Sequence, residues 1–392
     1  MTSTSCKPIA EELLARCLQG DEPDRLPAAL VEDSCGGALF GILVEGLADR
    51  FEPALCDTYA RLFPQAIAHA RPGVDAAALV ERYRRIRVPR PIAIEPRRVF
   101  VLSRITLGAD IAVTSVVLDA ARQRFPEAEI FLAGPLKNYE LFASAGRISA
   151  APVNYRRGSL RERLAVWEEL QQLLDVPDTL VLDPDSRLTQ LGLLPVCAEE
   201  CYRFFESRGY GGAGDAALPE LTAAWCGEVL GIRDARPWIA APAAAGVSGI
   251  AVSLGVGENP AKRLPDPFEE QLVALLGETG LPVTIDRGAG GEEAERVARA
   301  VARSGIVARV FDGPFAGFAS IIAASRLYVG YDSAGQHAAS AAGVPLISIF
   351  AGFPSPRMFS RWRPTGPRAT VIRVDTPDPA AVLAQVRTAI SL

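Results

Sequence analysis

Polar residues that could bind an anion stand together in the stretch YDSAGQHAASAAGVPLISIF, residues 331–350. The segments 326–330 and 345–350 are predicted to be buried strands, so the polar residues fall where a strand ends and a helix begins. Unpaired amide N–H groups and the positive end of the helix dipole favour a diphosphate at such a terminus. We predict that this loop binds the diphosphate of a ligand, called the donor below. The predicted donor-binding residues are Asp332, Ser333, Ala334, Gly335, Gln336 and His337.

The same loop has a purely structural interpretation, which the sequence leaves open. Asp332 or Ser333 would cap the helix, and His337 would fill space in its first turn. Under either interpretation, the alanine-rich body of the helix allows close packing on a sheet.

A second candidate loop, SLGVGENPAKRLPD, follows a predicted strand at 249–255. It lacks the spacing of a Walker A loop, but its glycines and its lysine could surround a phosphate. The chain has three lysines among its 41 basic residues, which draws attention to the one placed here. We predict donor contacts from Gly257, Glu258 and Lys262. A flexible loop with a solvated Lys262 is the alternative.

A third loop, SRITLGADIAVTS (103–115), leads from a predicted strand into a helix. Asp110 stands near the start of that helix, where the dipole keeps a carboxylate ionised. A base at this position could take the proton of an acceptor hydroxyl while a sugar leaves its nucleotide diphosphate. Capping of the helix is the alternative role for Asp110. The predicted acceptor-side residues of the loop are Arg104, Thr106 and Gly108.

The elements that must position these loops alternate between strand and helix, which is typical of parallel α/β sheets. The alternation stops at 235–246, a segment rich in Ala and Pro, and then restarts. Two α/β halves joined by a linker place a ligand cleft at the carboxyl ends of the strands. Strands are predicted at 99–103, 129–134, 179–183, 249–255 and 282–286, and helices at 110–125, 164–174, 267–280, 292–305 and 315–325.

The first ninety residues follow a different pattern. Apolar residues recur at helical spacing in 9–19, 51–63 and 75–86, and three prolines in 88–98 indicate an extended linker. The predicted boundaries are a helical extension at 1–95, an acceptor domain at 96–238, a nucleotide-sugar domain at 239–375, and a C-terminal helix at 376–392 that packs back on the first α/β domain.

Composition excludes several other classes of protein. A net charge of −5 argues against nucleic-acid binding, and 49% hydrophobic residues are ample for packed cores. The N-terminus shows no secretory signal, and the apolar stretch at 36–48 is too short to span a bilayer. Seven widely spread cysteines fit free thiols in a reducing cytoplasm. Cys197 and Cys201 have no second Cys or His pair nearby, so we predict no metal site.

Taken in order, the three loops resemble those of glycosyltransferase family 9, the ADP-heptose-dependent heptosyltransferases. The family's first loop reads Arg-Leu-x-x-x-Gly-Asp, and RITLGAD is similar to it. The second runs through small residues to Lys-Arg-Trp-Pro, as GVGENPAKRLP nearly does. YDSAGQHAA looks like the third, Asn-Asp-Ser-Gly-Pro-x-His-x-Ala. The resemblance covers about residues 98 to 370 and leaves the helical extension outside.

The resemblance implies a GT-B fold, an α/β architecture with two Rossmann-like domains facing a cleft, here with an added helical extension. It implies an inverting transfer of a heptose-like sugar from a nucleotide diphosphate, with ADP-heptose as the expected donor, to an acceptor hydroxyl. Asp110 would be the catalytic base, and Lys262 and His337 would contact the leaving diphosphate, with no metal ion or cofactor. The acceptor is open: a saccharide, a small metabolite, a lipid-linked glycan or a protein. Residues 1–95 could contact a partner or a second copy.

The departures from the family pattern keep other functions open. Ala109 and Ala334 stand where the family has Gly, and a left-handed backbone at either would cost ~1–2 kcal/mol. Gly290 stands where the family places a Glu against the donor nucleoside, for which Glu292 or Glu293 could substitute. The alternatives are a degenerate relative that binds a sugar nucleotide or a partner, and a sugar-nucleotide epimerase.

The segment 186–215 lies late in the first α/β half, where loops that contact an acceptor are expected. Its aromatic residues and glycines suit a ligand-facing loop, and a packed surface loop explains them equally well.

Overall fold

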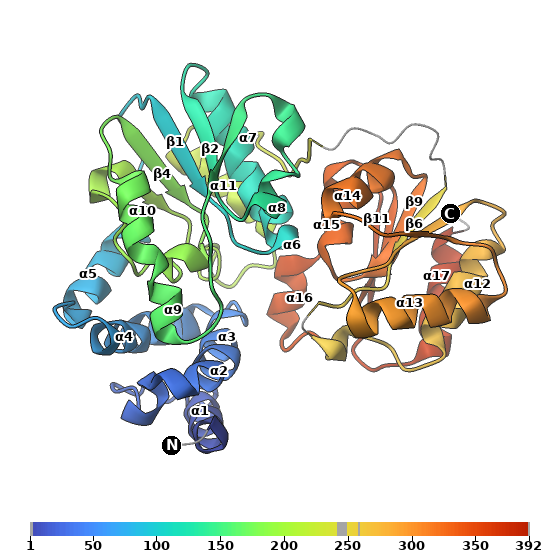
Figure 1. The fold of residues 1–392 in the computed structure, drawn as a ribbon, viewed down its shortest axis with the longest axis horizontal. Coiled ribbons are helices and arrows are strands. Elements are labelled where there is room, and N and C mark those ends of the chain that lie inside the picture. Colours follow the sequence, from blue (N-terminus) through green and yellow to red (C-terminus); the bar gives the residue numbers. More distant parts are fainter. Residues whose placement is uncertain (1–2, 241–248, 258, 391–392) are drawn as a thin grey trace. The chain divides into compact units, whose positions relative to one another are not determined.

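The computed structural model describes residues 3–240, 249–257 and 259–390. Its contacts divide the chain into two compact units. The first comprises Met1–Thr106, Val116–Tyr139 and Gly146–Ala235, and the second comprises Leu107–Ser115, Glu140–Ala145 and Arg236–Leu392. Each unit contains one parallel sheet (Figure 1). Leu107–Ser115 thus group with the second unit, although they follow the first strand of the first sheet.

The first sheet has the order β3-β2-β1-β4-β5, and every pair is parallel. The order reverses at β1, so the loops after β1 and β4 diverge at their carboxyl ends, where open α/β sheets bind ligands. Its strands are β1 (Arg98–Leu102), β2 (Glu129–Gly134), β3 (Ile148–Pro152), β4 (Thr179–Asp183) and β5 (Tyr202–Phe204). The helices after β1 are α6 (Leu107–Ala109), η4 (Asp110–Thr114), α7 (Ser115–Arg124), α8 (Leu136–Tyr139), η5 (Ala143–Ala145), α9 (Leu160–Leu164), α10 (Val166–Leu174), η6 (Arg187–Thr189), η7 (Glu199–Cys201) and α11 (Leu218–Val229).

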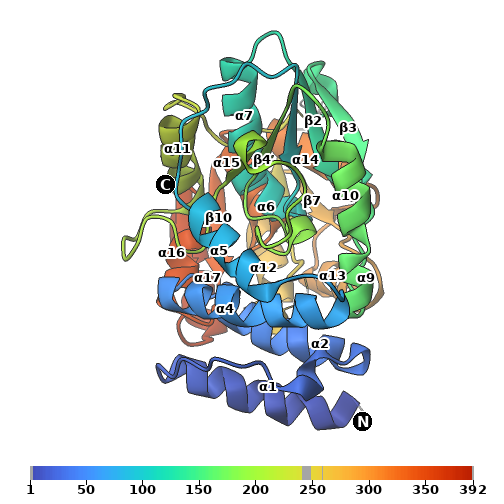
Figure 2. The same cartoon turned by 90° about the vertical axis from the view of Figure 1, so that its left-hand side faces the viewer.

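The N-terminal helices are part of the first unit and share its core. Phe100 of β1 and Val181 of β4 join one apolar cluster with Leu43, Tyr59 and Phe63 of the helical region. Figure 2 shows α1 beyond α2 and α4, on the side away from the sheet. Together with α9 and α10, the helical region therefore contributes to the apolar core beside the first sheet. Its elements are α1 (Ser3–Leu18), η1 (Ala28–Val31), η2 (Asp33–Cys35), α2 (Gly36–Ala38), η3 (Leu39–Val44), α3 (Glu45–Ala48), α4 (Pro53–Ala70) and α5 (Ala76–Ile86).

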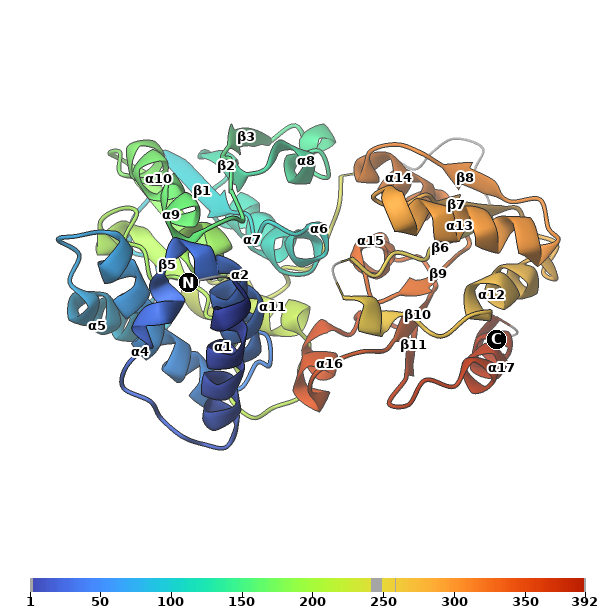
Figure 3. The ribbon, with the colours of Figure 1, turned by 60° about the horizontal axis from the view of Figure 1, so that its bottom comes forward.

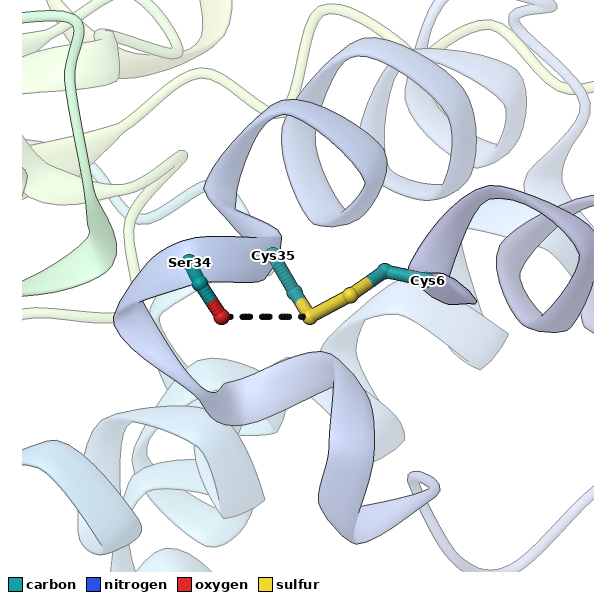
Figure 4. The surroundings of a disulfide bond; sticks show 3 residues. All are labelled: Cys6, Ser34 and Cys35. Atoms are coloured by element: carbon teal, nitrogen blue, oxygen red, sulfur yellow. Dashed lines mark hydrogen bonds between the residues drawn. A yellow bond between two sulfur atoms is a disulfide. The ribbon is translucent and has the colours of Figure 1, made fainter. Parts of the chain in front are cut away.

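A disulfide joins Cys6 of α1 to Cys35 of η2 (Figure 4). The two Cα atoms lie 5.6 Å apart, within the usual range for a disulfide, and both side chains are buried. The prediction that all seven cysteines are free thiols is therefore wrong for this pair. An odd count and wide spacing did not reveal that η2 folds back onto α1.

The second sheet has the order β11-β10-β9-β6-β7-β8 and is also parallel throughout. Helices α12, α13 and α17 lie on one face, and α14 and α15 lie on the other (Figure 3). The order reverses at β6, whose neighbours are β7 and β9. The strands are β6 (Ile250–Ser253), β7 (Val283–Asp286), β8 (Arg309–Phe311), β9 (Leu327–Tyr331), β10 (Leu346–Phe350) and β11 (Ala369–Arg373). The helices are η8 (Pro260–Lys262), α12 (Phe268–Gly277), α13 (Gly291–Ser304), α14 (Phe315–Ala324), α15 (Ala334–Ala341), α16 (Pro356–Trp362) and α17 (Pro379–Ile390).

The last helix packs inside the second unit. Val382 and Val386 of α17 belong to the apolar core of that unit, and Arg387 pairs with Glu278 at 2.6 Å. The sequence-based suggestion that this helix returns to the first α/β domain is therefore wrong, because its apolar face is buried against α12 and the second sheet.

None of the described helices is long and apolar enough to cross a membrane. The described residues also contain no group of three or more His, Cys, Asp or Glu side chains placed to hold a metal ion.

Candidate donor site

The site forms where the second sheet reverses its strand order. Ser253 at the end of β6 pairs in register with Gly330 of β9, so the loops that follow these strands leave the sheet side by side. The first loop carries Lys262 and the second carries Asp332. The Lys262 Nζ donates to Oδ2 of Asp332 at 2.6 Å and to its backbone carbonyl at 3.1 Å. The structure thus brings together the cation and the anion-binding loop that the sequence predicts.

The lysine loop is held in place by its neighbours. Asn259 caps the short turn η8 by accepting from the Ala261 amide at 3.0 Å, and its amide donates to the Gly352 carbonyl at 3.2 Å. A Cβ at Gly352, where φ is +65°, would lie 2.4 Å from the carbonyl carbon of Ala261. Glycine at this position therefore lets the loop after β10 lie directly against the turn that presents Lys262.

Gln336 positions Asp332 from inside the helix. Its Nε2 donates to Oδ1 of Asp332 at 2.5 Å and to the Trp362 carbonyl at 3.3 Å, and its Oε1 accepts from the Ser348 hydroxyl. The side chain is fully buried. These contacts indicate that Gln336 orients the acidic side of the site, while the direct donor contact predicted for it stays a prediction.

Helix α15 begins immediately after Ser333, which occupies the N-cap position but makes no capping hydrogen bond with its side chain. Gly335 in the first turn has a structural reason for lacking a side chain. A Cβ there would lie 2.2 Å from the hydroxyl oxygen of Tyr328, which is buried beneath the turn. Gly335 thus permits the helix to lie against Tyr328, in addition to any close approach of a ligand.

His337 lies in the same turn and is 5% exposed. Its ring meets Trp362 edge-on, with centroids 5.8 Å apart. Burial lowers the pKa of His337 to about 4; the Asp332 carboxylate opposes this shift and the Lys262 ammonium adds to it. The imidazole is therefore neutral near pH 7, and it can donate one N–H to an anion without adding a charge.

Asp110 lies within a helix rather than at its cap, since the helix starts at Leu107. A π-helical turn, η4, begins at Asp110, and π turns often occur at functional sites. The Asp110 side chain is fully buried, and its Oδ1 accepts from the Thr114 hydroxyl at 2.6 Å. Asp110 therefore does not cap the helix but lies inside its first turn. Its role as a catalytic base stays a prediction.

The segment that carries Asp110 packs on α15 within the second unit. A Cβ at Gly108 would lie 3.3 Å from both the Cα of Ala334 and the Cδ2 of His337, so glycine allows this close approach. Ala109 has φ −69°, and Ala334 is in regular helix, so neither alanine takes up a left-handed backbone. The two departures from the family pattern carry no strain.

The remaining predicted residues lie elsewhere. Arg104 is buried in the first unit, where it donates to the Pro184 carbonyl at 2.6 Å and to the Ser207 hydroxyl at 2.7 Å. Thr106 is exposed, and Gly257 is exposed with φ +61°. Glu258 lies outside the described residues.

The structure adds Glu293, which the sequence offered only as an alternative to Glu292. Its Oε2 accepts from the Ala289 amide at 2.7 Å. Its carboxylate lies over the strand ends, because a Cβ at Gly255 or Gly288 would meet it at 2.3 or 2.5 Å. Glu292 instead points outward, with a side chain that is 81% exposed. Gly290 has φ +98°, a backbone that disfavours a Glu there.

Comparisons with known proteins point to one family. The profile of glycosyltransferase family 9 (heptosyltransferase) matches residues 240–387. Over these residues the chain is similar to that family. Lys262, Asp332 and His337 lie within the matched residues, whereas Asp110 precedes them. No curated protein sequence matches the chain.

Solved structures of heptosyltransferases and of another family 9 glycosyltransferase share the GT-B fold with the chain. E. coli heptosyltransferase WaaC with ADP-2-deoxy-2-fluoro heptose is 17% identical, with a TM-score of 0.54, covering 74% of this chain and 99% of that one. E. coli ADP-heptose LPS heptosyltransferase II is 18% identical, with a TM-score of 0.52, covering 75% and 98%. A family 9 glycosyltransferase from Veillonella parvula is 16% identical, with a TM-score of 0.53, covering 76% and 91%. The family match at residues 240–387 supports a transferase activity, and the solved structures show the GT-B fold.

Proposed function

We propose that the protein is an inverting glycosyltransferase that moves a heptose-like sugar from ADP-heptose to an acceptor hydroxyl. One observation carries the proposal: the Lys262 ammonium reaches the start of α15 at the point where the strand order reverses. Helix N–H groups, the helix dipole and a cation together favour a diphosphate leaving group. The WaaC structure, whose bound ligand is an ADP-heptose analogue, supports the choice of donor.

In the proposed reaction the acceptor oxygen attacks the anomeric carbon of the donor sugar. The bond from that carbon to the diphosphate oxygen breaks, and the acceptor proton passes to the Asp110 carboxylate. Lys262 and His337 stabilise the negative charge that develops on the leaving diphosphate. Because Asp110 is fully buried here, the productive state is one in which its carboxylate becomes accessible to the acceptor.

Glu293 supplies the proposed contact with the donor nucleoside. Its carboxylate lies over the ends of β6 and β7, and β7 flanks β6 on the side away from β9. The carboxylate can accept hydrogen bonds from ribose hydroxyls or an adenine amino group. This contact replaces the one that the family places at the position of Gly290.

The diphosphate charge is met by Lys262 and by helix N–H groups, so the proposed chemistry needs no metal ion. We therefore propose that turnover persists in EDTA, and that the enzyme works in the cytoplasm, where nucleotide sugars are made.

A thermal-shift panel of ADP-, GDP-, UDP- and TDP-sugars tests the donor. A ligand that binds only the native state at one hundred times its Kd adds about 2.7 kcal/mol to stability. We expect ADP-heptose to raise the melting temperature most and Glu293→Ala to weaken the preference for ADP. Equal shifts from all four nucleotides, or a shift from none, would contradict the proposed donor.

A further inference from the structure

Charged side chains form an alternating chain at the carboxyl edge of the first sheet. Arg104 after β1 lies 3.7 Å from Asp185 after β4, and Asp185 lies 2.5 Å from Arg208 after β5. The Arg208 guanidinium also pairs with the Asp49 carboxylate of the helical region at 3.3 Å, and the same carboxylate pairs with the Arg187 guanidinium at 3.3 Å. Three guanidinium groups therefore share two carboxylates.

Only the outer end of this chain reaches solvent. The side chains of Arg104, Asp185 and Arg208 are 4%, 2% and 7% exposed, and that of Arg187 is 20% exposed. Within residues 181–194, all of which are described, every residue except Arg187 is buried. A packed loop thus presents one cation at its surface.

The charge at that end is not fully balanced. Asp49 is the ion-pair partner of Arg187 among the described residues, and its single carboxylate is shared with Arg208. The nearby Glu206 pairs with Arg87 at 2.8 Å instead. A guanidinium presents several donors in one plane and suits a carboxylate or phosphate.

Backbone strain gathers in the same segments. Among the described residues, six non-glycine residues have a positive φ, and five of them belong to this charged chain or lie within four residues of one of its members in the sequence. Left-handed backbone is unfavourable at such residues and is common where ligands bind. The five residues are Phe51, Ile105, Asp185, Gln190 and Leu191.

We propose that Arg187 is an acceptor subsite for an oxyanion, a carboxylate or phosphate group carried by the acceptor, and that Asp49 of the helical region positions it. This inference rests on the proposed function, because it assigns the acceptor end of that reaction. It also gives the helical region a role: Asp49 holds Arg187 and Arg208 over the strand ends.

Site-resolved arginine modification of the full-length wild-type protein tests the proposal. The protein is treated with p-hydroxyphenylglyoxal, and the modification rate at each arginine is measured by mass spectrometry. The probes are inorganic phosphate, D-glucose 6-phosphate and D-glucuronate, with D-glucose as the neutral comparison. At about four times its Kd, a probe should slow modification of Arg187 about fivefold. Arg161, which is 77% exposed and pairs with Asp33 at 3.6 Å, is the internal control.

The proposal is supported if either anionic sugar slows modification of Arg187 by the reagent, while glucose has no effect and the rate at Arg161 is unchanged. Protection by glucuronate indicates a carboxylate, and protection by the two phosphates alone indicates a phosphate. If neither anionic sugar slows modification of Arg187 more than that of Arg161, the proposal is overturned, and protection by inorganic phosphate alone indicates an adventitious ion only. Calorimetry with ADP on the same sample measures binding at the donor site separately. Failure of Arg187 protection therefore does not imply failure of the proposed donor site, and the reverse also holds.

Discussion

The ammonium group of Lys262 and the carboxylate of Asp332 lie 2.6 Å apart, although 70 residues separate them in the sequence. Both side chains are largely buried, at 17% and 6% exposed. Asp332 therefore holds the cation that the proposed diphosphate ligand would use. Donor binding must replace or share this ion pair.

Asp332→Asn should keep or increase the affinity for ADP, because the neutral amide no longer repels the diphosphate. The same change should lower the free energy of unfolding by about 1–3 kcal/mol, since Lys262 loses its charged partner. Calorimetry with ADP and urea unfolding measure the two effects. ADP lacks the transferred sugar, so a contact between Asp332 and that sugar does not affect this measurement. A tenfold loss of ADP affinity would show that Asp332 binds the nucleotide instead.

Gly335→Ala should destabilise the protein by about 1–3 kcal/mol, because the new methyl group would overlap the Tyr328 hydroxyl. Gly41 provides a matched control, since it is also helical and a Cβ there meets nothing within 4 Å. Gly41→Ala should be neutral or stabilising by up to about 1 kcal/mol. Urea unfolding compares the two, and equal effects would argue against the packing described for α15.

The buried imidazole of His337 predicts a pH effect on stability. Its pKa is about 4 in the folded protein and about 6.5 when unfolded. Between these values the unfolded chain binds the extra proton, so stability falls as the pH is lowered from about 6.5 to about 4. At pH 4.5 this amounts to about 2–3 kcal/mol. His337→Asn should lose that part of the pH dependence, and His69→Asn, at an exposed position, should retain it. Urea unfolding at pH 7 and 4.5 measures both variants.

The strands and helices near the site could be predicted from sequence, because each follows a short local pattern. Segments 326–330 and 345–350 correspond to β9 and β10 with shifts of one residue or less. The helix predicted at 110–125 is interrupted by a π turn that begins at Asp110, which apolar spacing does not reveal.

Features that depend on distant residues could not be predicted. The Lys262–Asp332 pair, the position of Glu293 over two glycines and the Cys6–Cys35 disulfide each join segments whose meeting is set by tertiary packing. The sequence also separated the helical region at residue 95, whereas its apolar side chains complete the core of the first sheet.

Asp110→Asn tests the proposed base. The asparagine can still accept from Thr114, so the helix should remain intact. Turnover of the sugar nucleotide should fall about 10²–10⁴-fold, while ADP affinity stays within twofold of wild type. A steady-state transfer assay and calorimetry measure the two. Turnover that remains within tenfold of wild type would remove Asp110 from the mechanism.

We propose that the loop after β6 and the start of α15 bind the diphosphate of a nucleotide sugar. Calorimetric titration of ADP into Lys262→Ala tests it most directly, with Lys137→Ala, at an exposed lysine of the first unit, as the matched control. Loss of one charge-assisted contact should weaken ADP binding about tenfold to one hundredfold, and Lys137→Ala should bind as wild type does. Equal affinities for wild type and Lys262→Ala would contradict the account.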